Sequence, residues 1–428
     1  MVINNRFNFR IVTPSSHAYF IYDKNFTKRM NRFLLTELPL KKKTVFLRVD
    51  YNVPFSENKI TDNTKIKASL PTIRYLLQNN CKIVLATHFG RPKGFSKEYS
   101  VAPLAAELQK LLPNKKIVKL NDCLGKEVLE NIQKGKAQTI FMLENLRFYP
   151  EEERNDTFFA HSLANLADLY VNDAFGVSHR EHASVCAITE FLPSAAGLLL
   201  ETEIRSLSQG LNPLKPSIWI MGGAKLDKIA LLERALQKYD YILIGGALAF
   251  AFLKAKGIPI GASKTDAASI DVARKILSGK YSSKIILPLD FNVAEFFSPR
   301  AKASTVGYNQ IQPHQVGLDL GPKTISLFRK YLSSAKTVVW NGPLGYIEWA
   351  KFAVSTKEIG RFVGKLESAT TLAGGGETAE ALIRFHLHHN LTHVSTGGGA
   401  ALEFLAEGDL PALQCLEKNY KKFKKRIL

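Results

Sequence analysis

The chain has 428 residues, of which 46% are hydrophobic, so it is long enough for two or three domains with sizeable cores. No apolar run approaches the ~20 residues of a membrane span, and the four cysteines form no Cys-x-x-Cys pair, which favours a reduced, cytoplasmic setting. The formal net charge of +20 is compatible with nucleic acid, an anionic membrane or small acidic substrates, but no zinc-ligand spacing, recognition-helix pattern or aromatic-interleaved basic stripe indicates sequence-specific DNA or RNA binding.

Residues 1–29 mix Asn, Arg and aromatic residues without a helical or strand period. They contain no long apolar segment, so we do not expect a secretory signal. We expect a disordered N-terminal extension. The alternatives are a transit peptide, for which a clear amphipathic stripe is missing, and a translation start placed too far upstream, because regular patterning begins at Met30.

From Val45 onward, apolar runs that resemble buried strands alternate with helical stretches, which predicts a parallel α/β sheet. The predicted strands cover 45–54, 83–87, 139–143 and 169–176, and a helix covers 65–77. The carboxyl ends of parallel strands meet at one edge of a sheet, where ligands bind in this class of fold. We therefore expect the polar residues that follow these strands to gather at one place.

A basic residue follows each of these segments: Lys65, His88, Arg91, Arg147 and Arg180. Cations that converge at one sheet edge need an anion, because unpaired charge is costly to hold together. The planar arginine fork suits carboxylate and phosphate groups. A surface salt bridge explains any one of these residues, but five together indicate a small, strongly anionic substrate.

The segment 193–201 has the character of a long helix, and we interpret it as the connector to a second domain. The second half then repeats one pattern, in which an apolar run, two or three glycines and a helical run follow one another. The four junctions cover 218–225, 241–247, 370–378 and 393–400. Glycine lets the backbone approach a ligand closely, and the free N–H groups and dipole of a helix N-terminus favour phosphate.

Glu377 directly follows three of these glycines. A carboxylate beside a bound phosphate needs a cation between them, and Mg²⁺ is the usual one. For an isolated junction, a plain glycine turn with Glu377 near the helix N-cap is the simpler explanation, but four such junctions favour nucleotide binding. Glu348, which follows the apolar run at 338–340, is either an acceptor for ribose hydroxyls or a plain surface carboxylate. Neither a P-loop nor a Gly-x-Gly-x-x-Gly fingerprint is present.

Taken together, these stretches closely resemble phosphoglycerate kinase, from Met30 to near the C-terminus. The motifs that carry the resemblance lie at 48–54, 88–92, 144–148, 171–176, 222–225, 339–343 and 394–400. The resemblance implies two doubly wound parallel-sheet domains joined by a helical hinge. It also implies reversible phosphoryl transfer between ATP and 3-phosphoglycerate, giving ADP and 1,3-bisphosphoglycerate, in glycolysis and gluconeogenesis.

The resemblance further implies a division of labour along the chain. Residues 30–200 would bind 3-phosphoglycerate, the C-terminal segment 408–428 would pack back on them, and residues 201–407 would bind the nucleotide with Mg²⁺. The two domains would close on each other and exclude water that would hydrolyse the acyl phosphate. We expect a monomeric, cytoplasmic enzyme with small-molecule substrates, without a specific nucleic acid partner and without a membrane partner.

Individual roles also follow from the resemblance. The residues expected at 3-phosphoglycerate are Asp50, Tyr51, Asn52, Lys65, His88, Phe89, Gly90, Arg91, Arg147 and Arg180. Those expected at ATP or ADP are Ala224, Lys225, Lys228, Gly246, Leu318, Asn341, Pro343, Glu348, Gly375, Gly376, Glu377 and Thr378, with Glu377 as the metal ligand. Those expected to act in catalysis are Lys65, Lys225, Gly375 and Gly398.

Three features depart from the family pattern. The family has arginine where Lys65 stands and usually aspartate where Glu377 stands, and its paired lysines are four apart, whereas Lys225 and Lys228 are three apart. Lys65 lacks the bidentate fork, and Glu377 adds a methylene at a metal that demands tight octahedral geometry. Two alternatives therefore stay open: a catalytically impaired homologue with a nucleotide-binding or regulatory role and, from the charge, a binder of nucleic acid or anionic surfaces.

Overall fold

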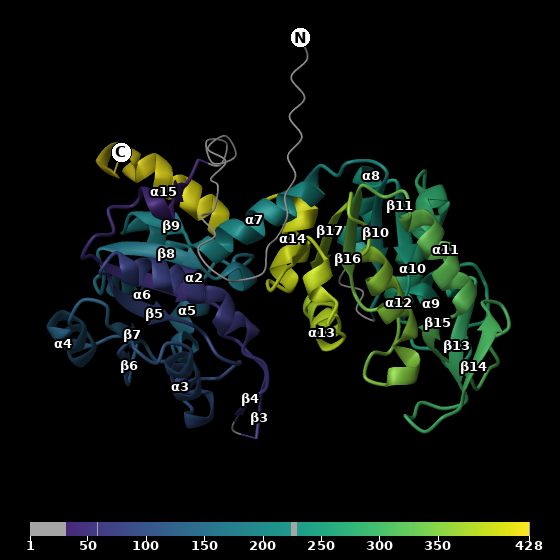
Figure 1. The fold of residues 1–428 in the computed structure, drawn as a ribbon, viewed down its shortest axis with the longest axis horizontal. Coiled ribbons are helices and arrows are strands. Elements are labelled where there is room, and N and C mark those ends of the chain that lie inside the picture. Colours follow the sequence, from purple (N-terminus) through teal and green to yellow (C-terminus); the bar gives the residue numbers. More distant parts are fainter. Residues whose placement is uncertain (1–30, 58, 224–228, 428) are drawn as a thin grey trace, which may run out of the picture.

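The computed structural model describes residues 31–57, 59–223 and 229–427. The expected N-terminal extension, with its alternatives of a transit peptide and a misplaced start, lies outside these residues, as do Ala224, Lys225 and Lys228. The described residues form two parallel sheets that lie side by side, each flanked by helices (Figure 1). The predicted fold class, two α/β domains, is confirmed. In this part of the chain no helix is both long and apolar enough to cross a membrane.

The first sheet has seven parallel strands in the order β1-β9-β8-β2-β5-β7-β6. Its strands are β1 (Phe33–Leu34), β2 (Thr44–Val49), β5 (Lys82–Ala86), β6 (Ile117–Lys119), β7 (Ile140–Met142), β8 (Leu169–Asp173) and β9 (Ser194–Ala196). Its helices are α2 (Thr64–Gln78), α3 (Ala102–Leu111), α4 (Lys126–Lys134), α5 (Pro150–Glu153) and α6 (Thr157–Ala164). The central strands β2, β5 and β8 are apolar on both faces because helices cover both faces of a parallel sheet.

The second sheet has six parallel strands in the order β12-β11-β10-β16-β17-β18. Its strands are β10 (Ser217–Met221), β11 (Tyr241–Ile244), β12 (Ile285–Ile286), β16 (Thr337–Asn341), β17 (Thr370–Gly374) and β18 (His393–Val394). Its helices are α8 (Ile229–Lys238), α9 (Leu248–Ala255), α10 (Ala267–Ser278), α11 (Pro322–Leu332), α12 (Val354–Val363), α13 (Gly376–Arg384) and α14 (Gly399–Glu407). All four predicted strand–glycine–helix junctions lie at the carboxyl ends of strands of this sheet.

A separate antiparallel sheet at the far end of the second half was not predicted. Strands β13 (Asp290–Ala294), β14 (Ala303–Gly307) and β15 (Val316–Leu320) form a separate antiparallel sheet. The apolar run at 285–290 is divided between β12 and β13 because Pro288, which lacks an N–H, interrupts the hydrogen-bond ladder. A two-stranded hairpin of β3 (Phe55–Ser56) and β4 (Lys59–Ile60) precedes α2.

Short 3-10 helices occupy several loops. They are η1 (Leu35–Glu37), η2 (Lys97–Tyr99), η3 (Leu146–Phe148), η4 (Phe175–Val177), η5 (Ala187–Glu190), η6 (Ser282–Lys284), η7 (Ala350–Phe352) and η8 (His388–Asn390). Two of them follow strands of the first sheet, η3 after β7 and η4 after β8, and they shape the loops that hold the candidate site.

The helix α7 (Leu198–Leu211) runs between the two sheets (Figure 1). It packs against α2 and β8 on one side and against α14 and β17 on the other. Its N-terminus is fixed by Asp173 at the end of β8, whose carboxylate accepts hydrogen bonds from the backbone N–H groups of Leu199 and Leu200 at 2.9 and 3.2 Å. Burial raises the pKa of Asp173 to about 7, against the effect of these hydrogen bonds. The connector predicted at 193–201 is therefore helical only from Leu198 onward, because Ser194–Ala196 form β9, and the carboxylate of a residue of the first sheet binds the first N–H groups of the helix.

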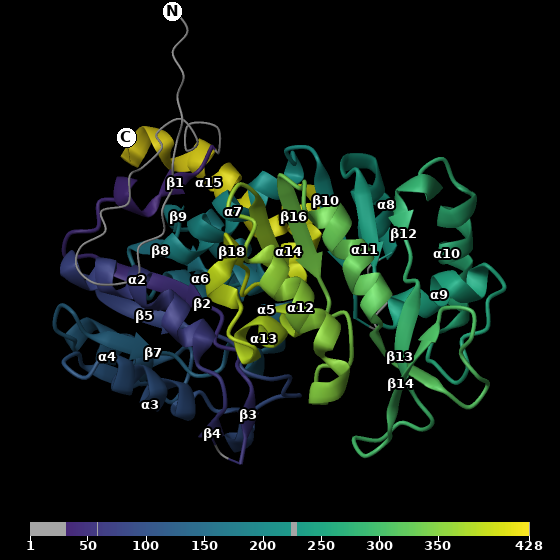
Figure 2. The ribbon, with the colours of Figure 1, turned by 45° about the vertical axis from the view of Figure 1, so that its right-hand side comes forward.

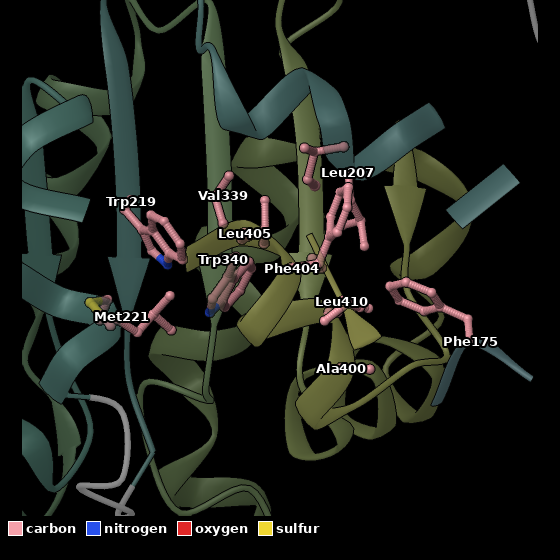
Figure 3. Packing of buried hydrophobic residues seen from close by; sticks show 14 of the residues in the cluster. Phe175, Leu207, Trp219, Met221, Val339, Trp340, Ala400, Phe404, Leu405 and Leu410 are labelled. Atoms are coloured by element: carbon pink, nitrogen blue, oxygen red, sulfur yellow. The ribbon is translucent and has the colours of Figure 1, made fainter. Parts of the chain in front are cut away.

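One hydrophobic core extends across the junction of the two halves. Figure 3 shows Phe175, from the loop after β8, pointing toward Phe404 of α14, and their ring centroids are 6.4 Å apart. Leu207 of α7 and Trp340 of β16 belong to the same cluster. Apolar packing therefore holds the base of the junction together, while the strand ends above it carry polar groups.

The chain ends in α15 (Pro411–Ile427), which lies against the first sheet (Figure 1). The side-chain amide of Asn419, which is 2% exposed, ties it there. Asn419 donates hydrogen bonds to the backbone carbonyls of Thr189 and Leu192 and accepts one from the N–H of Ser194 at 2.9 Å. The chain thus passes from the second sheet back to the first.

Candidate active site

The carboxyl ends of strands from both sheets meet at the junction of the two halves. Gly176, after β8, is one point of close approach, because a Cβ there would lie 2.2 Å from Oδ2 of Asp50 and 3.8 Å from Cα of Gly397. Asp50 follows β2 of the first sheet, and Gly397 follows β18 of the second. Figure 2 shows α13 and α14 near β18, the edge strand of the second sheet, on the side that faces the first half. The predicted gathering of strand-end residues is therefore present, and it spans both halves.

An ion pair occupies the first-half side of this junction. Nζ of Lys65 lies 2.7 Å from Oδ2 of Asp50, and the two side chains are 31% and 11% exposed. Burial alone would raise the pKa of Asp50, but Lys65 and His88 outweigh it and lower the pKa to about 2. Lys65 lies in the first turn of α2 and not directly after a strand, which corrects its predicted position.

His88 is not one of the cations that the sequence predicted. Burial lowers its pKa well below the ordinary value, and nearby Arg48 adds to the effect, so the imidazole is neutral near pH 7. Its Nδ1 lies 3.3 Å from Nη2 of Arg48, an arrangement in which the guanidinium donates. His88 is therefore a neutral hydrogen-bonding group in a cationic setting.

Arg48 is a site residue that the sequence reasoning missed. It lies within β2 and is fully buried. Its Nε donates to Oγ of Ser184 at 2.8 Å, and its Nη2 lies 3.7 Å from Oε1 of Glu152, which is also fully buried. The signal was present as a charged residue inside an apolar strand, since such a residue requires a partner.

A second set of contacts shapes the loop after β5. The amide of Asn145 accepts from the N–H of Phe89 at 3.1 Å and donates to its carbonyl at 2.7 Å. Arg147 donates from Nη1 to the carbonyl of Gly90 at 2.7 Å, and its Nε lies 3.0 Å from a carboxylate oxygen of Glu153. Asn52 accepts from the N–H of Gly90 at 3.0 Å. Asn52, Gly90 and Arg147 are thus brought together as predicted.

The other predicted substrate residues of this half fall into two groups. Arg91 and Arg180 are exposed, and Arg180 is close enough to Arg147 to lower the pKa of that guanidinium, which burial lowers further. The side chains of Tyr51 and Phe89 instead face the core. The Tyr51 hydroxyl is 2.6 Å from Oγ of Ser69, and the Phe89 ring packs edge-on against another aromatic ring. These two side chains therefore shape the loops that carry the site and do not line it.

A cavity of about 480 Å³ lies where the halves meet. It is lined by His179 of the first half and, from the second half, by Asn341 and the N-terminal residues of α13 and α14. Gly375, Gly376, Glu377, Thr378 and Gly398 all contribute to its wall. The predicted catalytic glycines, Gly375 and Gly398, therefore line the same cavity as His179, which directly precedes Arg180.

Asn341, at the end of β16, is buried at the wall of this cavity. Neither its Oδ1 nor its Nδ2 has a hydrogen-bond partner among the described residues, which is costly for a buried amide. Gly375 next to it has φ +97, and a Cβ there would lie 2.7 Å from Oδ1 of Asn341. The hydroxyl of Thr378 accepts a hydrogen bond from the N–H of Gly342 at 2.6 Å. The amide of Asn341 is therefore positioned to receive a ligand, and Thr378 shapes the loop beside it.

A second cavity, of about 380 Å³, lies in the second half. The predicted nucleotide residues Gly246, Leu318, Pro343, Glu348 and Glu377 all line it. Glycine is required at 246, because φ is +58 and a Cβ would lie only 2.5 Å from the backbone nitrogen of Gly223. Apolar walls with a few carboxylates at the rim are typical of sites for flat organic ligands.

Asp319 forms part of this cavity and was not predicted. It is 2% exposed, and its carboxylate accepts hydrogen bonds from both the hydroxyl and the N–H of Ser355. Burial raises the pKa of Asp319 to about 7, although these hydrogen bonds oppose the rise. Its contacts join β15 to α12 and so hold the wall of the cavity in place.

Another buried carboxylate links α7 to the junction of β18 and α14. Glu203 is fully buried and accepts from the N–H and hydroxyl of Thr396 at 2.9 and 3.0 Å, while Nε2 of His393 lies 2.8 Å away. Burial would raise the pKa of Glu203, but the neighbouring His393 and these hydrogen bonds lower it overall. The interdomain helix is therefore connected directly to the loop that carries Gly398.

The comparisons with known proteins decide the family. A model of the phosphoglycerate kinase family matches residues 35–408. The chain belongs to the phosphoglycerate kinase family. It is 43% identical over 387 residues to phosphoglycerate kinase from Dictyoglomus turgidum, covering 90% of this chain and 98% of that one. It is 42% identical over 393 residues to chloroplastic phosphoglycerate kinase 1 from Arabidopsis thaliana, covering 90% and 81%. The phosphoglycerate kinase structure from Coxiella burnetii has a TM-score of 0.80 at 35% identity, covering 91% and 100%.

Membership of the phosphoglycerate kinase family supports the enzyme interpretation. The chain is a kinase with a nucleotide substrate, and the comparisons give no support to a catalytically impaired homologue. Three of the predicted residues at and after the Gly-Gly-Ala junction, Ala224, Lys225 and Lys228, lie outside the described residues, so the roles assigned to them stay predictions.

Proposed function

We propose that this chain catalyses reversible phosphoryl transfer between ATP and the carboxylate of 3-phosphoglycerate. The observation that supports the proposal best is the cavity of about 480 Å³, which is shared by His179 of the first half and the glycine-rich helix N-termini of the second. A donor on one half and an acceptor on the other meet there. Phosphoryl transfer needs positioning and charge neutralisation more than covalent chemistry, which matches this site.

The cationic edge of the first sheet would hold 3-phosphoglycerate. Arg91, Arg147 and Arg180 supply positive charge, with Arg147 held in place by Gly90 and Glu153. Neutral His88 accepts a hydrogen bond from Arg48 through Nδ1 and is left with an Nε2–H to donate. Lys65 would leave Asp50, or share it, to stabilise the charge that spreads over the phosphoryl oxygens during transfer.

The glycine-rich edge of the second sheet would hold ATP or ADP. The base and ribose fit the cavity lined by Gly246, Leu318 and Glu348, and the phosphates fit the N-termini of α13 and α14. Glu377 is exposed in the first turn of α13 and lines both cavities, so it is placed between base and phosphates. Its donor set suits Mg²⁺, which takes one or two protein carboxylates and otherwise phosphate oxygens and water. The ion would neutralise phosphate charge, and Glu377 would hold it.

We further propose that residues 30–200, together with 408–428, form the 3-phosphoglycerate domain and that 201–407 form the nucleotide domain. The helix α7 connects them: Asp173 binds its N-terminal N–H groups to the first sheet, and Glu203, within the helix, binds it to the loop after β18. Closure about this helix would bring the two cavity walls together and exclude water.

The proposed setting is the cytoplasm, with the protein acting as a monomer on small-molecule substrates and without a specific nucleic acid partner. The described cysteines are all free thiols, which supports a reducing compartment. Light scattering would test the oligomeric state. If the charge of +20 instead reflects nucleic acid binding, a gel shift at low salt would appear and would fall steeply as salt rises.

The division into two half-sites can be tested by calorimetry. The variant Arg180→Met should weaken 3-phosphoglycerate binding about 10-fold or more, because a charged hydrogen bond is worth roughly 1.5–3 kcal/mol, and should leave ADP binding unchanged. The variant Glu348→Gln should weaken ADP binding and leave 3-phosphoglycerate binding unchanged. Loss of the same ligand in both variants would contradict the proposal.

A further inference from the structure

Two of the four cysteines lie together, away from the substrate cavities. Cys186, which is 3% exposed, immediately precedes η5, and Cys415 lies half-buried in α15. Both belong to one small apolar cluster, in which Cys415 packs against Cys186, Val177 and Ala412. Residues 229 positions apart in the chain (415 − 186) are thus brought together by the return of α15 to the first sheet.

The two thiols are neighbours, because both belong to the same small cluster and line the same cavity. The interaction between their side chains lowers the pKa of Cys415, and with burial it raises the pKa of Cys186, so Cys415 is the thiol that ionises more readily. Lys418, one turn further along α15, lowers the pKa of Cys415 as well, whereas burial opposes the shift. A thiolate is the form of cysteine that attacks a disulfide, and a neighbouring lysine favours it.

A reagent can reach the pair. Cys186 and Cys415 both line a cavity of about 190 Å³, whose rim carries Lys418 and Lys422 as well as Glu181 and Glu190. The charges at the rim are mixed, so the cavity does not form a site for one anion or one cation. The distinguishing feature of this cavity is that two cysteines, Cys186 and Cys415, line it together.

The other two cysteines provide an internal contrast. The thiol of Cys81 donates a hydrogen bond to the carbonyl of Leu40 at 3.1 Å, and that of Cys123 donates to the carbonyl of Glu144 at 2.9 Å. Both residues are fully buried, and burial raises both pKa values. Each is therefore a thiol without a sulfur partner in the described structure and is expected to be unreactive.

Backbone contacts on both sides hold the pair in place. The N–H of Ala412 donates to the carbonyl of Ser178 at 3.1 Å, and Asn419 donates to the carbonyls of Thr189 and Leu192. Cys415 thus lies between two anchored residues, Ala412 and Asn419, each about one turn of α15 away. The two sulfurs are therefore held near each other by the folded backbone.

We propose that Cys186 and Cys415 form a reversible intramolecular disulfide by exchange with a low-molecular-weight disulfide of the glutathione type. The Cys415 thiolate attacks one sulfur of the reagent, which breaks the reagent's S–S bond and releases one thiolate. Cys186 then loses its proton and attacks Sγ of Cys415, which forms the protein disulfide and releases the second thiolate. The two protein thiols are oxidised by two electrons, and the reagent is reduced to two thiols.

The disulfide would link α15 to the segment that carries His179 and Arg180, which extends from Ser178 to Cys186. This consequence rests on the proposed function, because that segment faces the substrate cavity. Fixing it to α15, which follows α14, is expected to restrict closure and to lower turnover several-fold in the oxidised protein, with full recovery on reduction.

The test is intact mass and disulfide mapping of the full chain after equilibration across a series of reduced-to-oxidised glutathione ratios. The expected result is the loss of two hydrogens and one linked peptide pair containing Cys186 and Cys415, absent from Cys186→Ser and from Cys415→Ser. The matched control Cys81→Ser should still form it. Glutathione adducts without the internal link, or links that involve Cys81 or Cys123, would overturn the proposal.

Wild-type mapping alone decides the covalent claim, even where a serine variant folds poorly. The activity claim is read separately, from turnover of the same oxidised sample before and after reduction. If the link forms but turnover is unchanged, the regulatory consequence is refuted and the disulfide itself stands. If the reduced protein shows no turnover at all, the proposed function fails while the mapping result is unaffected.

Discussion

Lys65, which stands where the resemblance to the family implies an arginine, is the residue at which we expect the clearest kinetic consequence. Its ammonium group lies 2.7 Å from Asp50 and is 31% exposed, so it is close to the site and free to turn toward a ligand. A lysine offers a point charge where arginine would offer a two-pronged fork. We expect Lys65→Arg to raise kcat with little change in KM, because the contact is made mainly in the transition state.

The magnitude follows from the contact. A charge-assisted hydrogen bond is worth roughly 1.5–3 kcal/mol, and each ~1.4 kcal/mol changes a rate tenfold. Lys65→Ala should therefore lower kcat about 10- to 100-fold. It also leaves Asp50, which is 11% exposed, without its ion-pair partner beside an anionic substrate. The repulsion between the unpaired Asp50 and the substrate should raise the KM for 3-phosphoglycerate in Lys65→Ala. Adding Asp50→Asn removes this repulsion, so the double variant should recover part of the KM but none of the lost kcat.

The assay is steady-state turnover with 3-phosphoglycerate and MgATP, coupled to consumption of the product. The matched control is Lys67→Ala, since Lys67 is an exposed lysine of the same helix that has no ion pair with Asp50. Thermal melting confirms that each variant is folded. If Lys65→Ala kept the parent kcat, or if Lys67→Ala lost as much, the role assigned to Lys65 would be wrong.

Four further predictions concern the supporting structure. The pKa of Asp50 is lowered from 3.8 to about 2 in the folded protein, so the carboxylate contributes stability above pH ~4, and this contribution is lost as the pH falls toward 2. In Lys65→Ala, acid unfolding curves should show a smaller loss of unfolding free energy between pH ~4 and ~2. Gly246→Ala should destabilise the fold and weaken ADP binding, because the added Cβ would lie 2.5 Å from a backbone nitrogen. The control Gly257→Ala has φ +74 but open space around the Cβ, so its free energy of urea unfolding should fall only by the ~1–2 kcal/mol of left-handed strain. Glu203→Gln should cost about 1–3 kcal/mol of unfolding free energy and lower kcat, and unchanged values of both would remove its proposed linking role. Glu377→Gln should raise the Mg²⁺ concentration needed for half-maximal turnover, and an unchanged Mg²⁺ dependence would show that the carboxylate does not hold the ion.

Much of the fold could be predicted from apolar runs and glycine turns, because burial of a strand and the geometry of a tight turn depend on residues that are close in sequence. The runs before the first two glycine junctions, which form β10 and β11, are apolar on both faces, as buried parallel strands require, and all four runs were found as strands that precede helices. The short strands β1, β6 and β9 were missed because two or three residues carry no detectable period. The antiparallel sheet was missed because alternating elements predict parallel pairing only where the crossovers are helical.

A site residue could be predicted from the sequence only where two conditions were met: its side chain is charged or polar, and it directly follows a predicted strand. Asp50, Asn52 and Arg147 satisfy both conditions, and the structure brings their loops together. The neutral state of His88 follows from burial and from Arg48, neither of which is visible along the chain. The partners of Glu203 lie 190 or more residues away, so only the folded chain could identify them.

The central claim is that a cationic edge on one sheet and a glycine-rich edge on the other form one phosphoryl-transfer site. The most direct measurement is the steady-state rate of the purified, reduced protein with both 3-phosphoglycerate and MgATP present. The account predicts saturable turnover in both substrates that is abolished by chelating Mg²⁺. Well-folded protein that binds each substrate but shows no turnover with both would contradict it.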